Sequence, residues 1–422
     1  METTLITTTH GRYLFGRTKH GVLGLEEIRV ILAEDDNLSS EEVTDFIRDC
    51  EALRHKTKQA RRSNSPYGFL QGLQKRDNDK TQPCVIFFRD SDRFGAAMFA
   101  TIQYNRIRYS LKPFKIPANR LTTLAVRRAG FIHDGSATTF AAVTKRLSWF
   151  ISNRLVDRID LSGVDTESPW FKYLTTQDLN KWRFFTIPRA RWQTRLIDPE
   201  TGQRLKHLSK KTRHNFERLD RVLVKHFQGD VEVKLIVSSD ELDHFIREAS
   251  KIVDQTYQAA IGIGVRANDE EQRAYLHMLA KEGILRAYLL VAKGEAIAYV
   301  LGPIQSGIFG AWSTSYRSAY SKLSPGTILL RRVMDLLVDE GALLFDFGTG
   351  ESDYKQILGS HQINEVDLRL YARRIQPTIT YALDFSFMRL NQWLNKLFRR
   401  INVQNILRRK WRKKLVNKKA KK

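Results

Sequence analysis

The stretch SPGTILLRRVMDLLVDEGALLFDFGTG, residues 324–350, carries the most informative pattern in the 422-residue sequence. It opens with Ser-Pro-Gly, which predicts the start of a helix because serine is a common N-cap and proline suits the first helical position. The helix is expected to end at Gly341, a typical C-cap. The apolar run Leu343–Phe347 then predicts a strand that only Asp346 interrupts. Two glycines just after the run permit a sharp turn.

The segments on either side of this stretch predict a mixed α/β domain. A short helix is expected at Tyr354–Leu358 and a last strand at Val366–Arg373. Upstream, the periodicity predicts a strand, two helices and a three-stranded meander, preceded by a basic helix. In chain order the upstream segments are Leu208–Lys225 (the basic helix), Val231–Val237, Ser238 to about Tyr257, Glu270–Lys281, Leu285–Ala292, Ala296–Gly302 and Gly307–Ser313.

The first half of the chain repeats this order of elements without repeating its residues. Its expected elements are a strand at Glu26–Leu32, a helix at Ser39–Arg54, a meander over Gln82–Leu111 with turns at Asp90–Arg93 and Gln103–Asn105, a helix at Ala137–Asn153, a strand at Arg158–Leu161, and closing strands at Trp182–Ile187 and Trp192–Ile197. The shared order predicts an internal duplication. The basic stretch 198–214 indicates a boundary, so the expected domains are 1–200, 201–375 and a tail, 376–422.

Composition restricts the class of protein and its partners. The formal net charge is +24, and residues 376–422 contain 14 Lys and Arg against one acid, Asp384. Such a charge favours polyanions, namely nucleic acid, acidic lipid or phosphate-rich ligands. With only Cys50 and Cys84, no disulfide framework is expected, which indicates a reducing compartment. We see no signal peptide and no membrane span, so the expected location is cytoplasmic, with peripheral attachment to the inner membrane face as an alternative.

The order of the second half resembles the GNAT acyltransferase fold. The resemblance rests on Ser324–Thr327 opening a helix, on Phe345–Gly348 with Gly350, and on Tyr354-Lys355. With the basic entry helix over Leu208–Arg213, these motifs are similar to the CelD/FemAB-type branch, which has two GNAT-like domains, the first degenerate. The resemblance implies transfer of an acyl group from acyl-CoA, or of an aminoacyl group from charged tRNA. It implies acceptors among envelope precursors and polysaccharide or lipid intermediates.

The start of the helix at residue 325 is the expected donor site. A helix N-terminus offers free amides and a positive dipole end, which suit a phosphate. The expected contacts are the backbone at Ser324, Gly326, Thr327 and Ile328, with charge from Arg317, Lys322, Arg331 and Arg332. A simple serine N-cap is the alternative. The usual GNAT pyrophosphate loop has several glycines and this one has only Gly326, which leaves acyl carrier protein or tRNA open as donors.

Lys355, Tyr354 and Asp346 are the expected catalytic residues. Acyl transfer from a thioester builds negative charge on the carbonyl oxygen, and a fixed cation or hydroxyl aimed there lowers the barrier. Tyr354 could alternatively protonate the leaving thiolate. The competing interpretations are a solvated lysine at Lys355 and a buried acid at Asp346 that caps the following turn. The nearby acids Glu351 and Asp353 are candidate bases, although solvated loop residues are commoner.

Further residues are expected to contact substrate. Trp312 and Tyr316 end a meander strand where GNAT strands separate to admit the donor, although core packing is the commoner role for Trp312. The basic segment that contains Lys206 and Arg213 is a candidate site for a phosphorylated acceptor or RNA, with a solvated interdomain helix as the alternative. No metal-ligand spacing and no Gly-x-Ser-x-Gly motif occur, so neither a metal nor a serine hydrolase is expected.

The tail combines charge with helical periodicity. Its apolar residues Leu390, Leu394, Leu397 and Ile401 fall on one side of a helix. A basic helix of this kind suits an anionic membrane surface, so residues 385–422 are expected to bind one. Packing on the protein itself and a nucleic-acid arm are the alternatives. Taken together, the sequence predicts an acyltransferase with no tightly bound cofactor, with an aminoacyl-tRNA-dependent transferase or a non-enzymatic nucleic-acid-binding protein as the alternatives.

Overall fold

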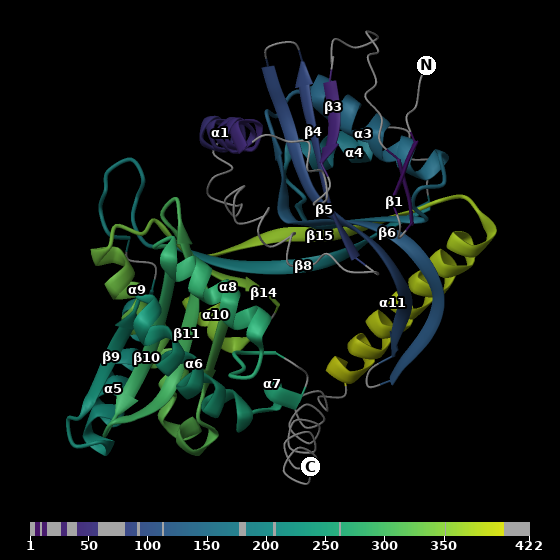
Figure 1. Cartoon of the computed structure of the whole chain (residues 1–422). Coiled ribbons are helices and arrows are strands. Elements are labelled where there is room, and N and C mark those ends of the chain that lie inside the picture. Colours follow the sequence, from purple (N-terminus) through teal and green to yellow (C-terminus); the bar gives the residue numbers. More distant parts are fainter. Residues whose placement is uncertain are drawn as a thin grey trace. The chain divides into compact units, whose positions relative to one another are not determined.

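The computed structural model describes residues 5–8, 11–14, 27–31, 40–57, 81–90, 93–111, 114–176, 183–205, 208–260, 263–350 and 352–400 (Figure 1). The chain divides into two compact units. Unit 1 is Met1–Arg189 with Asn364–Leu397, and unit 2 is Ala190–Ile363 with Phe398–Lys422. None of the helices in the described ranges is long and apolar enough to cross a membrane. The expected domain limits at residues 200 and 375 stay a prediction.

Unit 1 is a mixed sheet with helices on both faces. Its strands follow the order β3-β4-β5-β6-β7-β15. In chain order its elements are β3 Glu27–Ile31, α1 Ser40–Lys56, β4 Thr81–Asp90, β5 Arg93–Leu111, β6 Phe114–His133, α3 Ala137–Ser152, β7 Arg158–Asp165, α4 Pro169–Thr176, most of β15 His361–Tyr371 and most of α11 Ile375–Arg400. Strands β1 Leu5–Thr8 and β2 Gly11–Leu14 pair only with each other among the described strands.

The core of unit 1 lies on the two faces of this sheet. Helices α3 and α4 bury Phe140, Leu147 and Trp170 against one face, and α1 buries Phe46 against the other. Helix α11 adds a third cluster, in which Phe385 packs near a buried tyrosine of β15. The tail therefore begins as part of the unit 1 core, which is why its helix forms at Ile375.

Unit 2 places its strands between two pairs of helices. Its strand order is β8-β14-β12-β11-β10-β9, and β13 also pairs with β11. Its elements are the end of β8 Arg183–Arg195, α5 Lys210–His226, β9 Val231–Ile236, α6 Ser239–Asp254, α7 Tyr257–Ala260, α8 Glu270–Lys281, β10 Leu285–Ala292, β11 Glu295–Gln305, β12 Ile308–Gly310, β13 Ser313–Tyr316, the 3-10 helix η3 Ser318–Leu323, α9 Pro325–Asp339, β14 Leu344–Thr349 and α10 Asp353–Leu358.

The two pairs of helices in unit 2 form separate clusters. Helices α5 and α9 pack on one face of the sheet, where Phe216, Leu329 and Phe345 are buried together. Helices α6 and α8 cover the other face, around Phe245 and Tyr299 (Figure 1). Burial of apolar side chains at about 25 cal/mol per Å² supplies most of the free energy that holds such layers together.

The two units repeat one order of elements. Strand, helix, three strands, helix and strand occur as β3, α1, β4 to β6, α3 and β7 in unit 1, and as β9, α6, β10 to β12, α9 and β14 in unit 2. In each unit the last two of these strands are parallel neighbours, β6 with β7 and β12 with β14. This agreement in order and pairing direction confirms the internal duplication.

Each unit takes its closing strand from the other half of the chain. Strand β8 follows the unit 1 elements in sequence but pairs with β14, through residues 191–195. Strand β15 follows the unit 2 elements but pairs with β7, through residues 365–371. The boundary expected at residue 200 therefore falls after a strand that unit 2 requires.

Two details of the first half differ from the expectations. Residues Gln103–Asn105 are not a turn, because β5 continues through them and pairs with residues 121–123 of β6. The two closing strands expected between residues 182 and 197 form one strand, β8. At Gln103–Asn105 a polar interruption suggested a turn, and the neighbouring strand β6 satisfies the backbone there instead.

The strand exchange predicts how fragments of unit 2 behave. A fragment of residues 190–363 should melt cooperatively, whereas one of residues 201–363 should not. The shorter fragment lacks Arg191 and Gln193, which bind the buried carboxylate of Asp346. Breaking such a buried pair costs about 3–5 kcal/mol, a large share of the roughly 5–15 kcal/mol that stabilises a domain. Thermal melts followed by circular dichroism compare the two, and equal cooperative transitions would show that β8 is dispensable.

Candidate functional site

A close approach of two glycines breaks the strand that follows β11. A Cβ atom on Gly302 of β11 would lie 1.7 Å from the carbonyl oxygen of Gly310 in β12. No side chain fits at that separation, so only glycine at position 302 allows the contact. The strand is interrupted directly after Gly310, and it resumes as β13.

Beyond this break, β13 and β14 separate. The parallel pairing of β12 with β14 ends at Gly310 and Asp346, and the amide of Ala311 donates to the Asp346 carbonyl at 2.8 Å. Residues of β13 then pair with β11 alone among the described strands. Because antiparallel residues alternate, Thr314 and Tyr316 direct their backbone groups towards this unpaired edge. The side chain of Gln258 binds this edge of β13, because Gln258 Nε2 donates to the Thr314 carbonyl at 3.3 Å.

Aromatic side chains flank the unpaired edge. The Trp312 ring stacks on Tyr275 of α8 with centroids 5.9 Å apart and an angle of 10°. Trp312 is 44% exposed, so the core-packing role expected for it is wrong. Tyr316 is 41% exposed, and its ring lies against Gly326, where a Cβ would be 2.9 Å from the ring. The edge of β13 and the start of α9 are thus adjacent.

The start of α9 has fewer free amides than expected. Ser324 adopts a left-handed backbone with φ of 53°, and its side chain makes no capping hydrogen bond. Its carbonyl instead accepts from the amides of Thr327 and Ile328, each at 3.1 Å. The amide of Gly326 has no hydrogen-bond partner among the described residues, so it is the donor available at this helix end.

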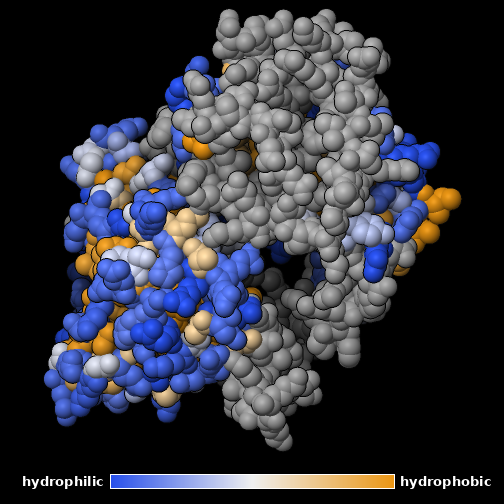
Figure 2. Space-filling model, in the orientation of Figure 1, coloured by the Kyte–Doolittle hydropathy of each residue, from blue (hydrophilic) through white to orange (hydrophobic). Residues whose placement is uncertain are grey.

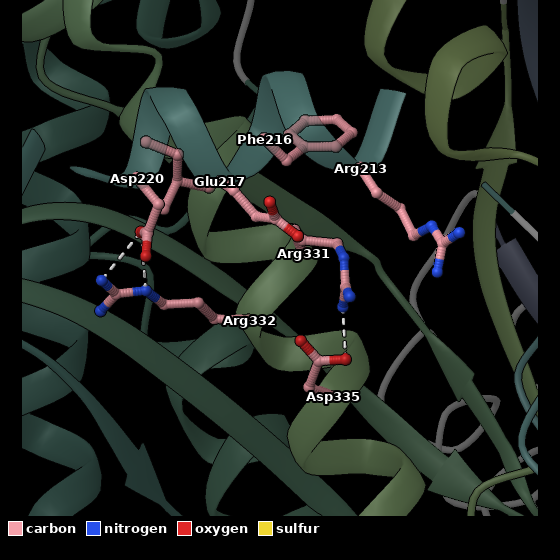
Figure 3. A pocket seen from close by; sticks show the side chains of 8 residues that line it. Arg213, Phe216, Glu217, Asp220, Arg331, Arg332 and Asp335 are labelled. Carbon is pink, nitrogen blue, oxygen red and sulfur yellow. Dashed lines mark hydrogen bonds and ion pairs between the residues drawn. The ribbon is translucent and has the colours of Figure 1, made fainter. Parts of the chain in front are cut away.

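The basic residues expected beside this helix end lie in two different places. Arg317 is held on β11, where its Nε donates to the Ala296 carbonyl at 2.7 Å and Nη1 contacts Glu295 at 2.8 Å. Arg331 and Arg213 instead line one pocket between α5 and α9 (Figure 3). The structure therefore places Arg331, which was expected at the donor site, beside Arg213, which was expected to bind a phosphorylated acceptor or RNA. Lys206 and Glu351 lie outside the described residues.

Asp346 is buried within a hydrogen-bonded network. Its Oδ2 accepts from Arg191 Nε at 2.7 Å and from Gln193 Nε2 at 3.0 Å, and its Oδ1 accepts from the Gly348 amide at 2.7 Å. Only 2% of the residue is exposed. These are the contacts of a residue that joins β8 to β14 and caps the turn after it, which was the alternative to a catalytic role. The catalytic assignment of Asp346 stays a prediction.

Lys355 is a buried amine beside this network. It is 8% exposed, so the interpretation of a solvated lysine is wrong. Its Nζ donates to the Thr349 carbonyl at 2.8 Å. Burial lowers the pKa of Lys355, and the negative charge of Asp346 raises it in part. Tyr354, the preceding residue, packs edge-on against Phe347 with ring centroids 6.2 Å apart.

Comparison with known proteins agrees with this geometry. Residues 210–356 match the model of the Acetyltransferase (GNAT) domain family. This part of the chain is a GNAT domain. The resemblance inferred from the residues is confirmed for this part of the chain, which is a GNAT-like acyltransferase domain. No curated protein matches the sequence.

One solved structure of low sequence identity, FemX, extends the likeness in fold beyond the GNAT domain. FemX is 10% identical, with a TM-score of 0.53 over 78% of this chain and 97% of its own, which indicates a shared fold. The chain is also similar to a tandem GNAT protein from the clavulanic acid biosynthesis pathway, at 14% identity and a TM-score of 0.45, covering 83% of this chain and 100% of that one. L-PGS from Bacillus licheniformis is 14% identical, with a TM-score of 0.44 over 81% of this chain and 96% of its own.

Unit 1 has the order of the GNAT domain but different side chains at the equivalent place. Its parallel pairing of β6 with β7 ends at Val126 and Leu161. Beyond that point, Phe131 of β6 packs against Trp170 of α4 with centroids 4.9 Å apart. Trp170 occupies α4, the element that corresponds in order to α10, which carries Lys355. Unit 1 has aromatic packing where the GNAT domain has an amine and a carboxylate.

Several residues of the GNAT domain site were not expected from the sequence. They are Arg191, Gln193, Gln258, Tyr275 and Gly302. Strand β8 is distant in sequence from β14, so no local pattern relates Arg191 to Asp346. Gly302 ends an apolar run, and an isolated glycine in a strand is a known sign of close backbone approach. That was the one local signal available.

The Asp346 network predicts a large effect on stability. Replacement Asp346→Ala should lower the free energy of unfolding by about 3–5 kcal/mol, because it leaves the guanidinium of Arg191 without its carboxylate in a mostly buried position. Urea denaturation measures this. Asp353→Ala, an exposed acid of the nearby α10, is the matched control and should change little. An unchanged midpoint for Asp346→Ala would mean that the network does not stabilise the fold.

Proposed function

We propose that the GNAT domain transfers an acyl group from a thioester donor, acyl-CoA or acyl carrier protein, to an amine or hydroxyl of an envelope, lipid or polysaccharide intermediate. The observation that carries this proposal is the buried amine of Lys355 next to the point where β13 leaves β14. A thioester placed along the unpaired edge of β13 would find backbone amides on one side. It would find a fixed cation at the end of β14.

The chemistry requires charge stabilisation at one oxygen. Attack of the acceptor on the thioester carbon gives a tetrahedral intermediate, whose carbonyl oxygen is negative, and loss of the thiolate then restores the carbonyl. One N–H of the Lys355 ammonium group donates to the Thr349 carbonyl, and the other two can donate to that oxygen. Its burial strengthens the interaction, because there is little water to screen it. In this scheme Tyr354 protonates the departing thiolate, and the acceptor loses its proton to a base.

The remaining expected residues take supporting roles in the proposal. The amide of Gly326 receives a donor phosphate at the start of α9, while Trp312 and Tyr316 line the donor's path. Asp346 positions the end of β14 and supports the charge of Lys355. Asp353 is the candidate base within the described part of the chain. Ser324 and Thr327 shape this helix end, because the Ser324 carbonyl accepts from the Thr327 amide, and Arg317 holds β13 against β11.

A tRNA-dependent transferase is the second candidate, and the formal charge of +24 favours it. A non-enzymatic nucleic-acid-binding protein would share that charge. Ligands that bind the folded state raise its melting temperature. Acyl-CoA, acylated carrier protein, tRNA and duplex DNA are therefore tested side by side at one ionic strength. Stabilisation by a thioester donor supports the proposal, and stabilisation by tRNA alone supports the second candidate.

Replacement of Lys355 tests the catalytic proposal. Lys355→Met keeps the length of the side chain in its buried position and removes the charge, so transfer should fall at least about a hundredfold, equal to about 2.7 kcal/mol of barrier. Acyl transfer to an amine acceptor measures this. Circular dichroism and donor affinity should be unchanged. Wild-type turnover by the folded variant would rule out Lys355 as the cation.

The same proposal predicts a dependence on pH. Because burial lowers the pKa of Lys355, its ammonium form is lost at a lower pH than that of an ordinary lysine, whose pKa is near 10.5. Transfer that needs the ammonium is present below that lowered pKa and disappears as the pH rises through it. The Lys355→Arg variant keeps its positive charge throughout this pH range, so it should no longer lose transfer activity at alkaline pH. A rate that rises with pH through the same range would indicate a base instead.

We further propose that α11 attaches the protein to an anionic membrane. Five exposed apolar residues recur along this helix, at Ile375, Ile379, Leu383, Leu390 and Trp393. Figure 2 shows hydrophobic residues beside hydrophilic ones at the place where α11 begins in Figure 1. The opposite side of α11, with Phe385, packs on unit 1. The basic residues of the tail supply charge, and those after Arg400 lie outside the described residues.

The exposed side of α11 is tested without disturbing its packed side. Leu390→Ser combined with Trp393→Ser should weaken binding to vesicles of phosphatidylglycerol and phosphatidylcholine at least about tenfold, because it removes two apolar anchors. Co-sedimentation measures this. Vesicles of phosphatidylcholine alone are the control for charge. Equal binding of the wild type and the double variant would show that α11 is not the membrane contact.

A further inference from the structure

A pocket of about 160 Å³ lies between α5 and α9. Three arginines and three acids of the two helices line it, over the apolar side chains of Phe216 and Ile328. Figure 3 shows Arg213 and Glu217 on α5 and Arg331 on α9, with the Arg331 guanidinium directed at Asp335. The pocket lies along the side of α9, whereas the donor site proposed above is at the N-terminus of that helix.

The ion pairs around this pocket satisfy two of its three arginines and leave the third, Arg213, without a partner among the described residues. Arg332 is satisfied by Asp220, with its Nη2 and Nε at 2.8 and 3.1 Å from one carboxylate oxygen. Asp335 is shared, because both Arg331 and Arg204 contact it. Arg213 has no ion-pair partner among the residues that the structure describes. Its Nε is buried and donates to no acceptor there.

Two guanidinium groups, those of Arg331 and Arg204, thus share the carboxylate of Asp335, and the charge of Arg213 acts on Arg331 as well. Burial lowers the pKa of Arg331, and the charges of Arg204 and Arg213 lower it further. Glu217 offsets part of this charge, but its side chain is 69% exposed and lies 3.7 Å from His214. Without a ligand, Arg213 and Arg331 repel each other, and a buried N–H lacks an acceptor. An anion with several oxygens would satisfy both groups at once.

We propose that this pocket binds the phosphate group of a small phosphorylated ligand. A phosphate monoester carries about −1.5 to −2 charges at neutral pH and has three terminal oxygens, so it accepts from guanidinium groups that approach from different helices. A carboxylate has two oxygens in one plane and supplies less charge. The apolar side chains of Phe216 and Ile328 in the pocket lining reduce the screening of such a contact by water. The inference does not depend on which acyl group the GNAT domain transfers.

Calorimetry of the full chain with inorganic phosphate tests the site at constant ionic strength. Arg213→Gln should weaken phosphate binding at least tenfold, because it removes the guanidinium that has no other partner. Arg218→Gln is the matched control, since this arginine is exposed on the same helix and outside the pocket. The proposal is overturned if the wild type binds no phosphate, if Arg213→Gln binds it equally, or if Arg218→Gln loses as much.

A stability measurement separates a ligand site from a structural role. Without phosphate, Arg213→Gln should melt at the same temperature as the wild type or higher, because the repulsion with Arg331 is gone. Phosphate should raise the melting temperature of the wild type and not of the variant. A variant that melts lower in the absence of phosphate and binds phosphate normally would make Arg213 structural and would overturn the proposal.

Two further ligands identify the source of the phosphate. If Arg213→Gln weakens binding of CoA but not of 3′-dephospho-CoA, the pocket holds the phosphate of the donor. If it weakens neither, although binding of inorganic phosphate is lost, the pocket holds a phosphorylated acceptor or effector. Both readouts are binding measurements, so they are independent of the loss of turnover expected for Lys355→Met.

Discussion

The carboxylate of Asp346 holds unit 2 together where β8 meets β14. It takes three hydrogen-bond donors, from Arg191, Gln193 and the Gly348 amide, and two of these lie on β8. A buried carboxylate is stable only when it is paired and hydrogen-bonded, so unit 2 depends on a strand that comes from the other half of the chain. The same carboxylate supports the charge of Lys355. One interaction therefore joins the exchanged strand, the turn after β14 and the candidate catalytic amine.

The elements of unit 2 were largely predictable, because each has its own periodicity or punctuation. The helix that begins at Pro325 and the meander from Leu285 follow directly from apolar spacing and from turn residues. The exchange of β8 and β15 was not predictable, since a strand of given pattern satisfies the backbone of either sheet equally well. For the same reason the interaction between Asp346 and Arg191, which are 155 residues apart, left no signal in the sequence.

The candidate site was predictable in its residue types and less so in their environments. Asp346 stood out because a charge within an apolar stretch needs a partner, and Lys355 because it follows the turn after that stretch. Their burial and their partners required coordinates. At the start of α9, a serine followed by proline suggested free amides, but the left-handed backbone of Ser324 turns its carbonyl onto two of them. The sequence specifies which groups are present, and the backbone geometry decides which of them remain available to a ligand.

The large positive charge is less uniform than the composition suggests. Many described arginines are paired with acids inside their own unit, for example Arg286 with Glu340 and Arg369 with Asp384. Such pairs contribute nothing net to the field that a distant polyanion would sense. The excess is greatest in residues 376–422, which contain 14 Lys and Arg against one acid, whereas the α5–α9 pocket is lined by equal numbers of arginines and acids. A protein that tracks a nucleic-acid backbone needs a row of unpaired cations, whereas a confined cluster of arginines suits a single phosphate. Within the described units, the arrangement of arginines thus agrees with the single phosphate proposed for the α5–α9 pocket.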